Sequence, residues 1–324
     1  MFLLHLLLFL VSVYLLYVSG GLVVKGLTRV ARFLQWKEFV VAFFVMAAAG
    51  SLPNLLVGIS SSLRGIPELS FGDITGGNVV DLTLVIGLAI LFTRGKSISA
   101  TSETIQTTSI FTSLAALLPL ILILDGQISR VDGIALIIFF LLYIVWLFSK
   151  KERFQQIYEE HKPEGIKIIK EVGLFIKNSG KVLLGVALLV GAAQGIVVSS
   201  SFFAEFWEVP ILMIGLLIVG LGNALPETYF TIISARKNET TMLLGNLMGA
   251  VIVPSTLVLG IVAILTPIRI ADFSPLAFAR AFIVISVLLF FLFVKTGEKI
   301  TLKEALVLLG VYLVFVASQI WIAY

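Results

Sequence analysis

The chain has 324 residues, of which 59% are hydrophobic and 13% are charged, and its mean hydropathy is +1.10. A chain this apolar along its whole length would aggregate in water, so we predict an integral membrane protein. Its apolar runs are continuous and helical in length, which excludes the alternating pattern of an outer-membrane barrel. The net charge of +4 comes mostly from basic loop residues and gives no indication of nucleic-acid binding.

Few side chains could carry enzyme chemistry. The sequence has no cysteine, and its two histidines, His5 and His161, fall near a membrane end and in a polar loop. This excludes thiolate metal sites and argues against a His-rich zinc enzyme. No paired aspartates and no Ser–Lys arrangement lie at membrane depth. We therefore expect no enzymatic activity, no catalytic residues and no cofactor.

Ten membrane-spanning helices are predicted, because about 20 apolar residues cross a bilayer. The first is not a cleavable signal peptide, since its basic cluster follows the apolar run instead of preceding it. The ten helices cover approximately residues 2–24, 38–62, 72–92, 107–125, 131–149, 179–201, 209–235, 241–265, 276–294 and 302–322. The predicted fold class is an all-α polytopic membrane protein.

Basic residues are distributed unevenly between the two sets of alternating loops. Of the 23 lysines and arginines, all but Arg64, Arg130, Arg269 and Arg280 lie on one side. The excess of positive charge in cytoplasmic loops then places both termini outside and residues 150–178 in the cytoplasm. That segment mixes both charges and is too short for a regulatory domain, so it is predicted to be a connector.

Two segments of the chain resemble each other, Ala49–Gly87 and Gly222–Gly260. They align without a gap, and their shared residues are Pro53 with Pro226, Gly72 with Gly245, Gly76 with Gly249, and Gly87 with Gly260. They lie on the second and third and on the seventh and eighth predicted helices, so they enter the membrane from opposite sides. We predict two five-helix halves of inverted topology, 1–149 and 179–324, joined by the connector. Such repeats with interrupted helices indicate a transport site near the membrane midplane, although a duplication kept only for structure is the alternative.

Prolines and acids inside the repeats mark the predicted site. Pro53 and Pro226 are predicted to lie mid-helix, where each removes a backbone hydrogen bond; a simple kink is the alternative to an ion site. Glu227 and Asp81 are carboxyls at membrane depth, which usually mark an ion or proton path. A neutral Glu227 that hydrogen-bonds between helices remains an alternative. Each half contributes one acid at a different place, because Asn54 is equivalent to Glu227 and Pro254 is equivalent to Asp81.

Neutral oxygen donors surround the two acids, and hard cations such as Na⁺ and Ca²⁺ prefer carboxylates and carbonyls of this kind. Small residues at 76–77 and 249–250 allow close helix packing, which explains them without an ion. Asp73 and Glu68 lie near the predicted mouth of the third helix; they either face water at the outer surface or serve ion entry. The predicted cation ligands are Glu227, Asp81, Asn54, Ser51, Asn78, Asn223, Gly50 and Ser255.

Four short motifs carry a resemblance to a known family. They are AGSLPN (49–54) with GDITGGN (72–78), and GNALPE (222–227) with GNLMGAV (245–251). These resemble the cation/calcium exchanger superfamily, of the sodium–calcium exchanger type, whose repeats have the form G-T-S-x-P-E followed by G-N-x-x-G-S-N. The resemblance implies secondary active antiport by alternating access. It also implies that helices 2, 3, 7 and 8 form a core that encloses the ion sites. The long helices 1 and 6 would then slide across this core.

The resemblance makes Glu227 one of the two glutamates that flank a Ca²⁺ site, while Asn54 replaces the other. Ser51 is retained as a ligand, but Ala224, Ala250 and Val251 lack the side-chain oxygens of the family. We therefore predict an antiporter of Ca²⁺ or a related cation against Na⁺ or H⁺, with altered stoichiometry or ion choice. The alternatives are a monovalent cation/proton antiporter and a non-transporting cation-binding membrane protein. The expected partners are inorganic cations and the lipid bilayer, for a monomer in a prokaryotic cell membrane.

Overall fold

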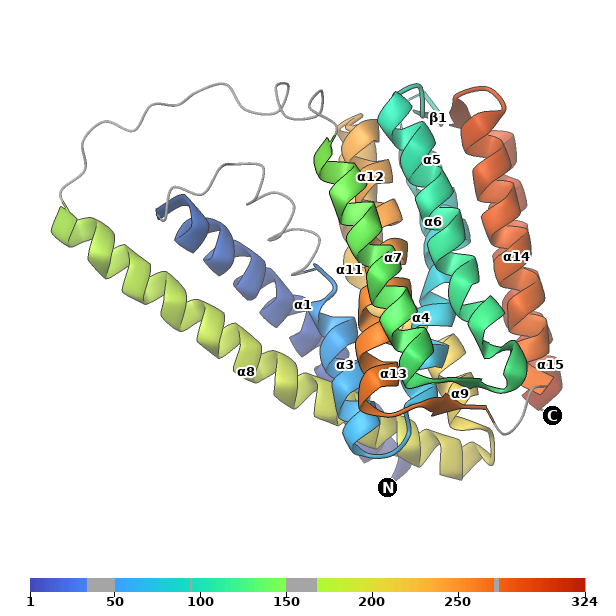
Figure 1. Cartoon of the computed structure of the whole chain (residues 1–324), viewed down its shortest axis with the longest axis horizontal. Coiled ribbons are helices and arrows are strands. Elements are labelled where there is room, and N and C mark those ends of the chain that lie inside the picture. Colours follow the sequence, from blue (N-terminus) through green and yellow to red (C-terminus); the bar gives the residue numbers. More distant parts are fainter. Residues whose placement is uncertain (34–49, 94, 150–167, 271–273, 324) are drawn as a thin grey trace.

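The chain forms an almost entirely helical bundle in a computed structural model that describes residues 1–33, 50–93, 95–149, 168–270 and 274–323 (Figure 1). The first half contains α1 (Phe2–Phe33), α3 (Leu52–Leu63), α4 (Glu68–Val79), η2 (Val80–Val85), α5 (Ile86–Phe92), β1 (Ser97–Ser99), α6 (Glu103–Leu122), η3 (Ile123–Asp125), β2 (Gln127–Ile128) and α7 (Arg130–Ser149). The second contains α8 (Ile168–Trp207), α9 (Ile211–Ile214), η5 (Gly215–Val219), α10 (Gly220–Asn223), α11 (Leu225–Arg236), α12 (Thr240–Val253), η6 (Pro254–Val258), α13 (Leu259–Leu265), β3 (Ile268–Arg269), α14 (Ser274–Lys295), β4 (Lys299–Thr301) and α15 (Leu302–Ala323).

The helices are long and apolar enough to cross a bilayer, as the sequence predicts. The described residues contain nine such spans and one shorter apolar helix, α3. The predicted span 38–62 begins in a part that lies outside the described residues, and α3 forms its end. Several boundaries differ from the prediction, two of them by many residues. The first helix continues to Phe33, and α8 begins at Ile168, inside the predicted connector.

Elements of the two halves correspond in order and in register. Helices α3 and α11 begin at the equivalent residues Leu52 and Leu225, and each is twelve residues long. A π-helical segment follows in each half, η2 and then η6, and α5 and α13 have the same length. The chain is therefore an all-α polytopic membrane fold with an internal structural repeat. The exact division at 150–178 remains a prediction.

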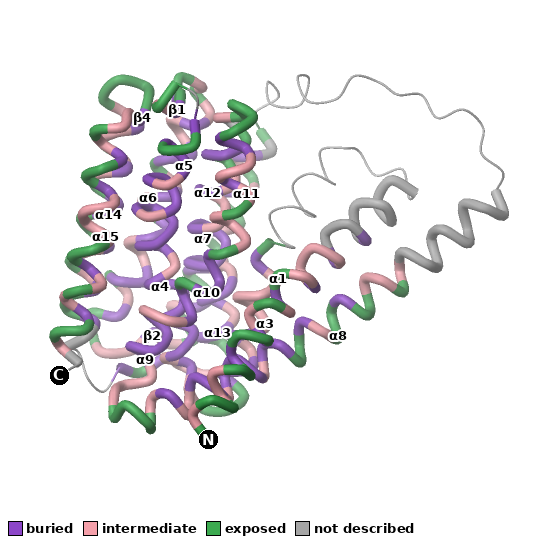
Figure 2. The backbone as a smooth tube through the Cα atoms, turned by 180° about the vertical axis from the view of Figure 1, so that it is seen from behind, coloured by how far each residue is buried: buried purple, intermediate pink, exposed green. Residues whose placement is uncertain are grey.

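Two short antiparallel strand pairs join the halves to each other. Strand β1 pairs with β4, and β2 pairs with β3, so each pair takes one strand from each half. The two pairs lie at opposite ends of the bundle, and both chain ends are at the β2–β3 end, on different sides of the molecule (Figure 2). An internal two-fold relation predicts this pattern, because exchanging the halves converts one pair into the other.

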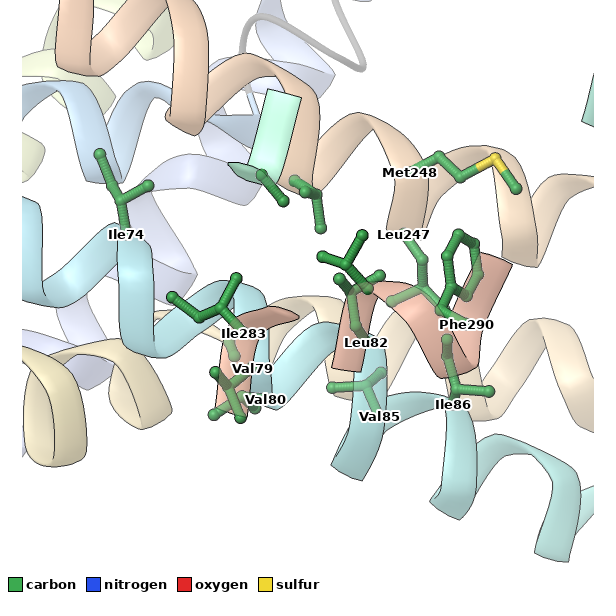
Figure 3. Close-up of a cluster of buried hydrophobic side chains, with 14 of the residues drawn as sticks. Ile74, Val79, Val80, Leu82, Val85, Ile86, Leu247, Met248, Ile283 and Phe290 are labelled. Carbon is green, nitrogen blue, oxygen red and sulfur yellow. The ribbon is translucent and has the colours of Figure 1, made fainter. Parts of the chain in front are cut away.

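The upright helices pack around one hydrophobic core. Side chains from α4, η2 and α5 meet those of α12 and α14, with Leu82, Ile86 and Phe290 fully buried (Figure 3). Burial of such side chains among neighbouring helices fixes the elements that carry polar groups. In a membrane, this packing is held mainly by van der Waals contact and close helix approach.

Helices α1 and α8 form a separate, slanted pair beside the upright bundle (Figure 1). They have their own hydrophobic cluster, which includes Leu16 of α1 and Ile196 of α8. Two glycines of α8 bring the helices close: a Cβ on Gly195 would lie 2.1 Å from Ser12 Oγ, and one on Gly185 would lie 3.2 Å from the Ser19 carbonyl oxygen. Close packing of this kind ties the two helices into one unit.

The closest backbone contact in the described bundle joins α4 to the first part of the seventh span. A Cβ on Gly76 would lie 2.0 Å from the Leu216 carbonyl oxygen, and one on Gly72 would lie 2.3 Å from that of Leu212. In return, a Cβ on Gly215 would lie 2.5 Å from the Leu69 carbonyl oxygen. Only glycine fits these positions. The motif glycines therefore hold α4 against η5, which agrees with the packing role predicted for Gly76.

Candidate ion-binding site

Both repeat prolines lie at a break in a spanning helix. Pro226 is in the first turn of α11, directly after the turn at Ala224 that ends α10 (Gly220–Asn223), and Pro53 holds the same place in α3. The prediction of mid-helix prolines is wrong in this detail, because each span is interrupted just before its proline. Since proline has no N–H, Pro226 cannot bond to the Gly222 carbonyl one turn earlier. At membrane depth such a carbonyl needs another partner, and here it accepts a hydrogen bond from a backbone N–H at the end of α10.

The third and eighth spans each contain a π-helical turn. Asp81 lies in η2, and Pro254 and Ser255 open η6 at the equivalent place. A π-helical turn inserted in an α-helix often accompanies a functional site, because it widens the helix and redirects side chains. In this fold the turns lie level with the residues that approach the helix breaks.

A small cavity of about 10 Å³ lies between these four spans. That is about the space of a single water molecule, and therefore of one desolvated small cation. Its lining includes three pairs of equivalent positions from the two halves: Asn54 and Glu227, Gly77 and Ala250, Asp81 and Pro254. The remaining lining residues are Ile74, Asn78, Gly220, Asn223 and Ala224.

Two carboxyl groups at the cavity have oxygens without a hydrogen-bond partner. Asp81 Oδ1 and Glu227 Oε2 are both buried and unpartnered within the described part of the chain. Asp81 is 5% exposed and lies within electrostatic range of Glu227 and of Asp73. A buried carboxylate without a partner is strongly unfavourable, so these oxygens need a cation or a proton.

Two asparagine side chains at the cavity are held by their amide nitrogens. Asn78 Nδ2 donates to Ser255 Oγ at 2.7 Å. Asn223 Nδ2 donates to both carboxylate oxygens of Asp73, at 2.9 and 2.8 Å. In each case the amide oxygen has no hydrogen-bond partner among the described residues. Amide oxygens are suitable ligands for hard cations.

The structure brings most of the predicted ligands together. The cavity is lined by five of them: Asn54, Asn78, Asp81, Asn223 and Glu227. Ser255 is hydrogen-bonded to one of these lining residues, Asn78. Ser51 precedes the first turn of α3, and neither it nor the exposed Gly50 belongs to the cavity lining. Their position at the cavity does not by itself show which of these residues bind an ion, so the ligand set remains a prediction.

Asp73 does not face water at the mouth of the third helix, which is one of the two alternatives that the sequence predicted for it. It is completely buried in α4, with 0% of its surface exposed, and it contacts Asn223 of α10. The prediction failed because α4 begins at Glu68, so Asp73 lies more than a turn inside it. Its burial could be anticipated only from its partner, which is far away in the sequence.

The site differs from a dense acidic metal centre. Within the described residues, no group of three or more His, Cys, Asp or Glu side chains could hold a metal ion. A cation in this cavity would therefore bind one or two carboxylates together with amide and main-chain oxygens. Ligation of this kind suits weakly held, exchangeable ions such as Na⁺ and Ca²⁺.

Fold and site together define a polytopic membrane protein with a central polar site between broken, inverted helices, the arrangement typical of secondary transporters. The sodium/calcium exchanger protein family matches residues 4–149 and 179–321, so the chain belongs to that family. It is 26% identical to the inner membrane protein YrbG of Escherichia coli over 98% of this chain and 97% of that protein. It is 23% identical to the sodium/calcium exchanger MaX1 of Methanosarcina acetivorans, over 92% of this chain and 93% of that protein.

Two solved structures share the fold. The sodium–calcium exchanger NCX_Mj, soaked with Na⁺ and Sr²⁺, matches with a TM-score of 0.63 at 27% identity, over 98% of this chain and 99% of that chain. The H⁺/Ca²⁺ exchanger CAX matches with a TM-score of 0.76 at 18% identity, over 98% of this chain and 84% of that chain. The predicted family and fold class are thereby confirmed.

Proposed function

We propose that the chain is a secondary active antiporter that exchanges Ca²⁺ or a related cation against Na⁺ or H⁺. The observation that carries this proposal is the pair of unpartnered buried carboxyl oxygens, Asp81 Oδ1 and Glu227 Oε2, beside one ion-sized cavity. Relatives and solved structures of the family are named as Na⁺/Ca²⁺ and H⁺/Ca²⁺ exchangers, which supports both candidate driving ions.

In this proposal the two acids hold the transported cation. Two carboxylates neutralise one Ca²⁺, and the amide oxygens of Asn78 and Asn223 replace part of its water shell. Either Na⁺ or H⁺ can occupy the same carboxylates after the Ca²⁺ leaves. Competition for the same oxygens then couples the opposing fluxes without a second set of acids.

The α1–α8 pair is the proposed moving element. It contacts both helix breaks: Gly20 of α1 lies against Pro53, and a Cβ on Gly222 would lie 3.3 Å from a methyl group of Val13. Its own hydrophobic cluster allows it to move as a unit against the upright bundle. A shift of this pair would open the cavity alternately to each side of the membrane.

Flux in proteoliposomes tests the proposed function. The purified chain should take up Ca²⁺ when a Na⁺ gradient or a pH gradient opposes it, and each gradient is applied separately. Uptake in neither case, with Ca²⁺ binding intact, would contradict antiport and favour a non-transporting cation-binding protein. Uptake with only one gradient identifies the counter-ion.

A monovalent cation/proton antiporter is the second candidate. It is favoured by Asn54, which leaves the cavity without the second glutamate of the family motif, and by the absence of a three-acid group in the described residues. Competition for bound Na⁺ separates the two candidates. Displacement of Na⁺ by micromolar Ca²⁺ would exclude a purely monovalent site.

The placement in the membrane, with both termini outside and a monomeric state, also remains a proposal. The chain has no cysteine, so single introduced cysteines report their side directly. Lys299→Cys, at the exposed β1–β4 end, should react with a membrane-impermeant maleimide only from the cytoplasm. Arg269→Cys, at the exposed β2–β3 end, should react only from outside.

A further inference from the structure

Asp73 is a third buried acid near the cavity, and it is not part of the cavity lining. It sits in α4 with 0% of its surface exposed. Both of its carboxylate oxygens accept hydrogen bonds from one atom, Asn223 Nδ2, at 2.9 and 2.8 Å. Asn223 itself lines the cavity at the end of α10. Asp73 therefore contacts the cavity lining through Asn223, and its side chain also lies within electrostatic range of Asp81.

A carboxylate fixes the direction of the amide beside it. Because a carboxylate only accepts hydrogen bonds, the NH₂ group of Asn223 must face Asp73. The amide oxygen then lies on the other branch of the planar group, turned away from Asp73. A charge-assisted hydrogen bond on the NH₂ group also draws electrons toward that oxygen, which makes it a better cation ligand.

The other cavity asparagine provides an internal comparison. Asn78 Nδ2 donates to Ser255 Oγ at 2.7 Å, so it is also held by its nitrogen. A hydroxyl can donate as well as accept, so it neither dictates which amide atom faces it nor carries a charge. Asn78 is held in place by a neutral hydroxyl group, whereas Asn223 is held by a carboxyl group, which polarises the amide when it is ionised.

The motif around Asp73 departs from the family form at the position where the charge appears. The first copy reads G-D-I-T-G-G-N, where the second copy has Asn246 in place of Asp73. The same copy has Asn54 where the second has Glu227. Compared with the family motif, the first half thus lacks a carboxyl at Asn54, which lines the cavity. It carries a different carboxyl at Asp73, which lies behind the helix break that follows α10 in the other half.

We propose that Asp73 is a positioning residue for the transported cation, which turns and polarises the amide oxygen of Asn223 and so offsets the missing carboxylate at Asn54. This inference rests on the proposed function, because it assigns Asp73 to the same cation site. Its rival is a purely structural bond between α4 and α10, in which the charge has no effect on ions.

Binding of Ca²⁺ to the purified full-length chain, followed by calorimetry and by thermal stabilisation, separates the two. Asp73→Asn keeps the shape but lets the Asn223 amide face either way. We expect about a 10-fold weaker Ca²⁺ affinity, the usual effect of changing a group behind a metal ligand. Melting without Ca²⁺ should stay close to that of the wild type. Ser255→Ala, the matched change behind Asn78, should weaken binding less.

Rescue and coupling give the decisive readouts. Asn54→Glu should restore Ca²⁺ affinity in the Asp73→Asn background, because it supplies the charge directly at the cavity. Equal gains from Asn54→Glu in both backgrounds would overturn the proposal, since independent sites give additive effects. Unchanged Ca²⁺ affinity of Asp73→Asn would overturn it as well.

Asn223→Ala covers the case in which Asp73→Asn does not fold. It removes the oxygen that Asp73 is proposed to position, so Ca²⁺ affinity should fall about as far as with Asp73→Asn, again roughly 10-fold. Wild-type affinity of Asn223→Ala would overturn the proposal by itself. Flux through the wild-type protein is measured in parallel. Absence of flux would contradict the proposed function. Normal flux, with variants that bind Ca²⁺ as tightly as the wild type, would contradict only the role of Asp73.

Discussion

The two inverted copies of the repeat keep the same backbone but carry different chemistry. Each has a helix break before a proline, followed by a π-helical turn in the next span at the equivalent place. At the cavity, however, Asn54 of the first half is equivalent to Glu227 of the second, and Asp81 is equivalent to Pro254. The helix breaks and the π-turns are therefore common to both halves. The acidic side chains that line the cavity, by contrast, come one from each half.

Replacing the glutamate should break this comparison most severely. Glu227→Gln removes one unit charge beside the cation; two unit charges 4 Å apart attract by about 4 kcal/mol at an effective dielectric constant near 20, which is a lower bound for divalent Ca²⁺. We expect Ca²⁺ affinity to fall roughly 1,000-fold and exchange to vanish. Asn54→Gln, the matched change at the equivalent position, should leave most of the exchange intact. Wild-type flux in Glu227→Gln would exclude this residue as a ligand.

The second acid should matter less than Glu227 but in the same direction. Asp81→Asn keeps an oxygen at the cavity and removes its charge, so we expect Ca²⁺ affinity to fall about 10- to 100-fold. Binding of Na⁺ should weaken less, because a monovalent ion needs less countercharge. Isothermal titration with each ion measures the ratio. An equal loss for both ions would argue that Asp81 has no part in selecting charge.

Close helix packing should be broken by one methyl group. Gly76→Ala would place a Cβ 2.0 Å from the Leu216 carbonyl oxygen, so α4 and η5 must separate. Overpacking of this kind typically destabilises by about 1–3 kcal/mol. Thermal melting in detergent should show the loss. Gly310→Ala is the control, because a Cβ there meets no described atom within 4 Å; equal melting of both variants would contradict the packing argument.

The smallest expected effect concerns the link between the slanted pair and the bundle. Gln194 of α8 donates to Ser60 Oγ at 3.2 Å and accepts from Arg64 Nε at 3.1 Å. Gln194→Ala removes bonds worth about 0.5–1.5 kcal/mol each, so turnover should change a few-fold while Ca²⁺ affinity stays constant. Flux and binding measured together test this, and a changed affinity with constant turnover would contradict it.

Much of the fold follows from the sequence, because helix length and the aligned prolines and glycines are local signals. The sequence indicated both acids and the asparagines of the cavity in the same way. It did not place Asp73 correctly, since its partner Asn223 lies on another span and no local pattern encodes that contact. Nor did it predict the π-turns at Val80–Val85 and Pro254–Val258.

The central claim is that one cation is held by an acid from each half. Anomalous diffraction from crystals soaked in Sr²⁺, with and without competing Na⁺, tests it most directly. The account predicts a single strong peak in the cavity, within ligand distance of both Glu227 and Asp81, roughly 2.3–2.6 Å as for Ca²⁺. This peak should weaken as Na⁺ rises. A peak that contacts neither acid, or none in the cavity while the protein exchanges Ca²⁺, would contradict it.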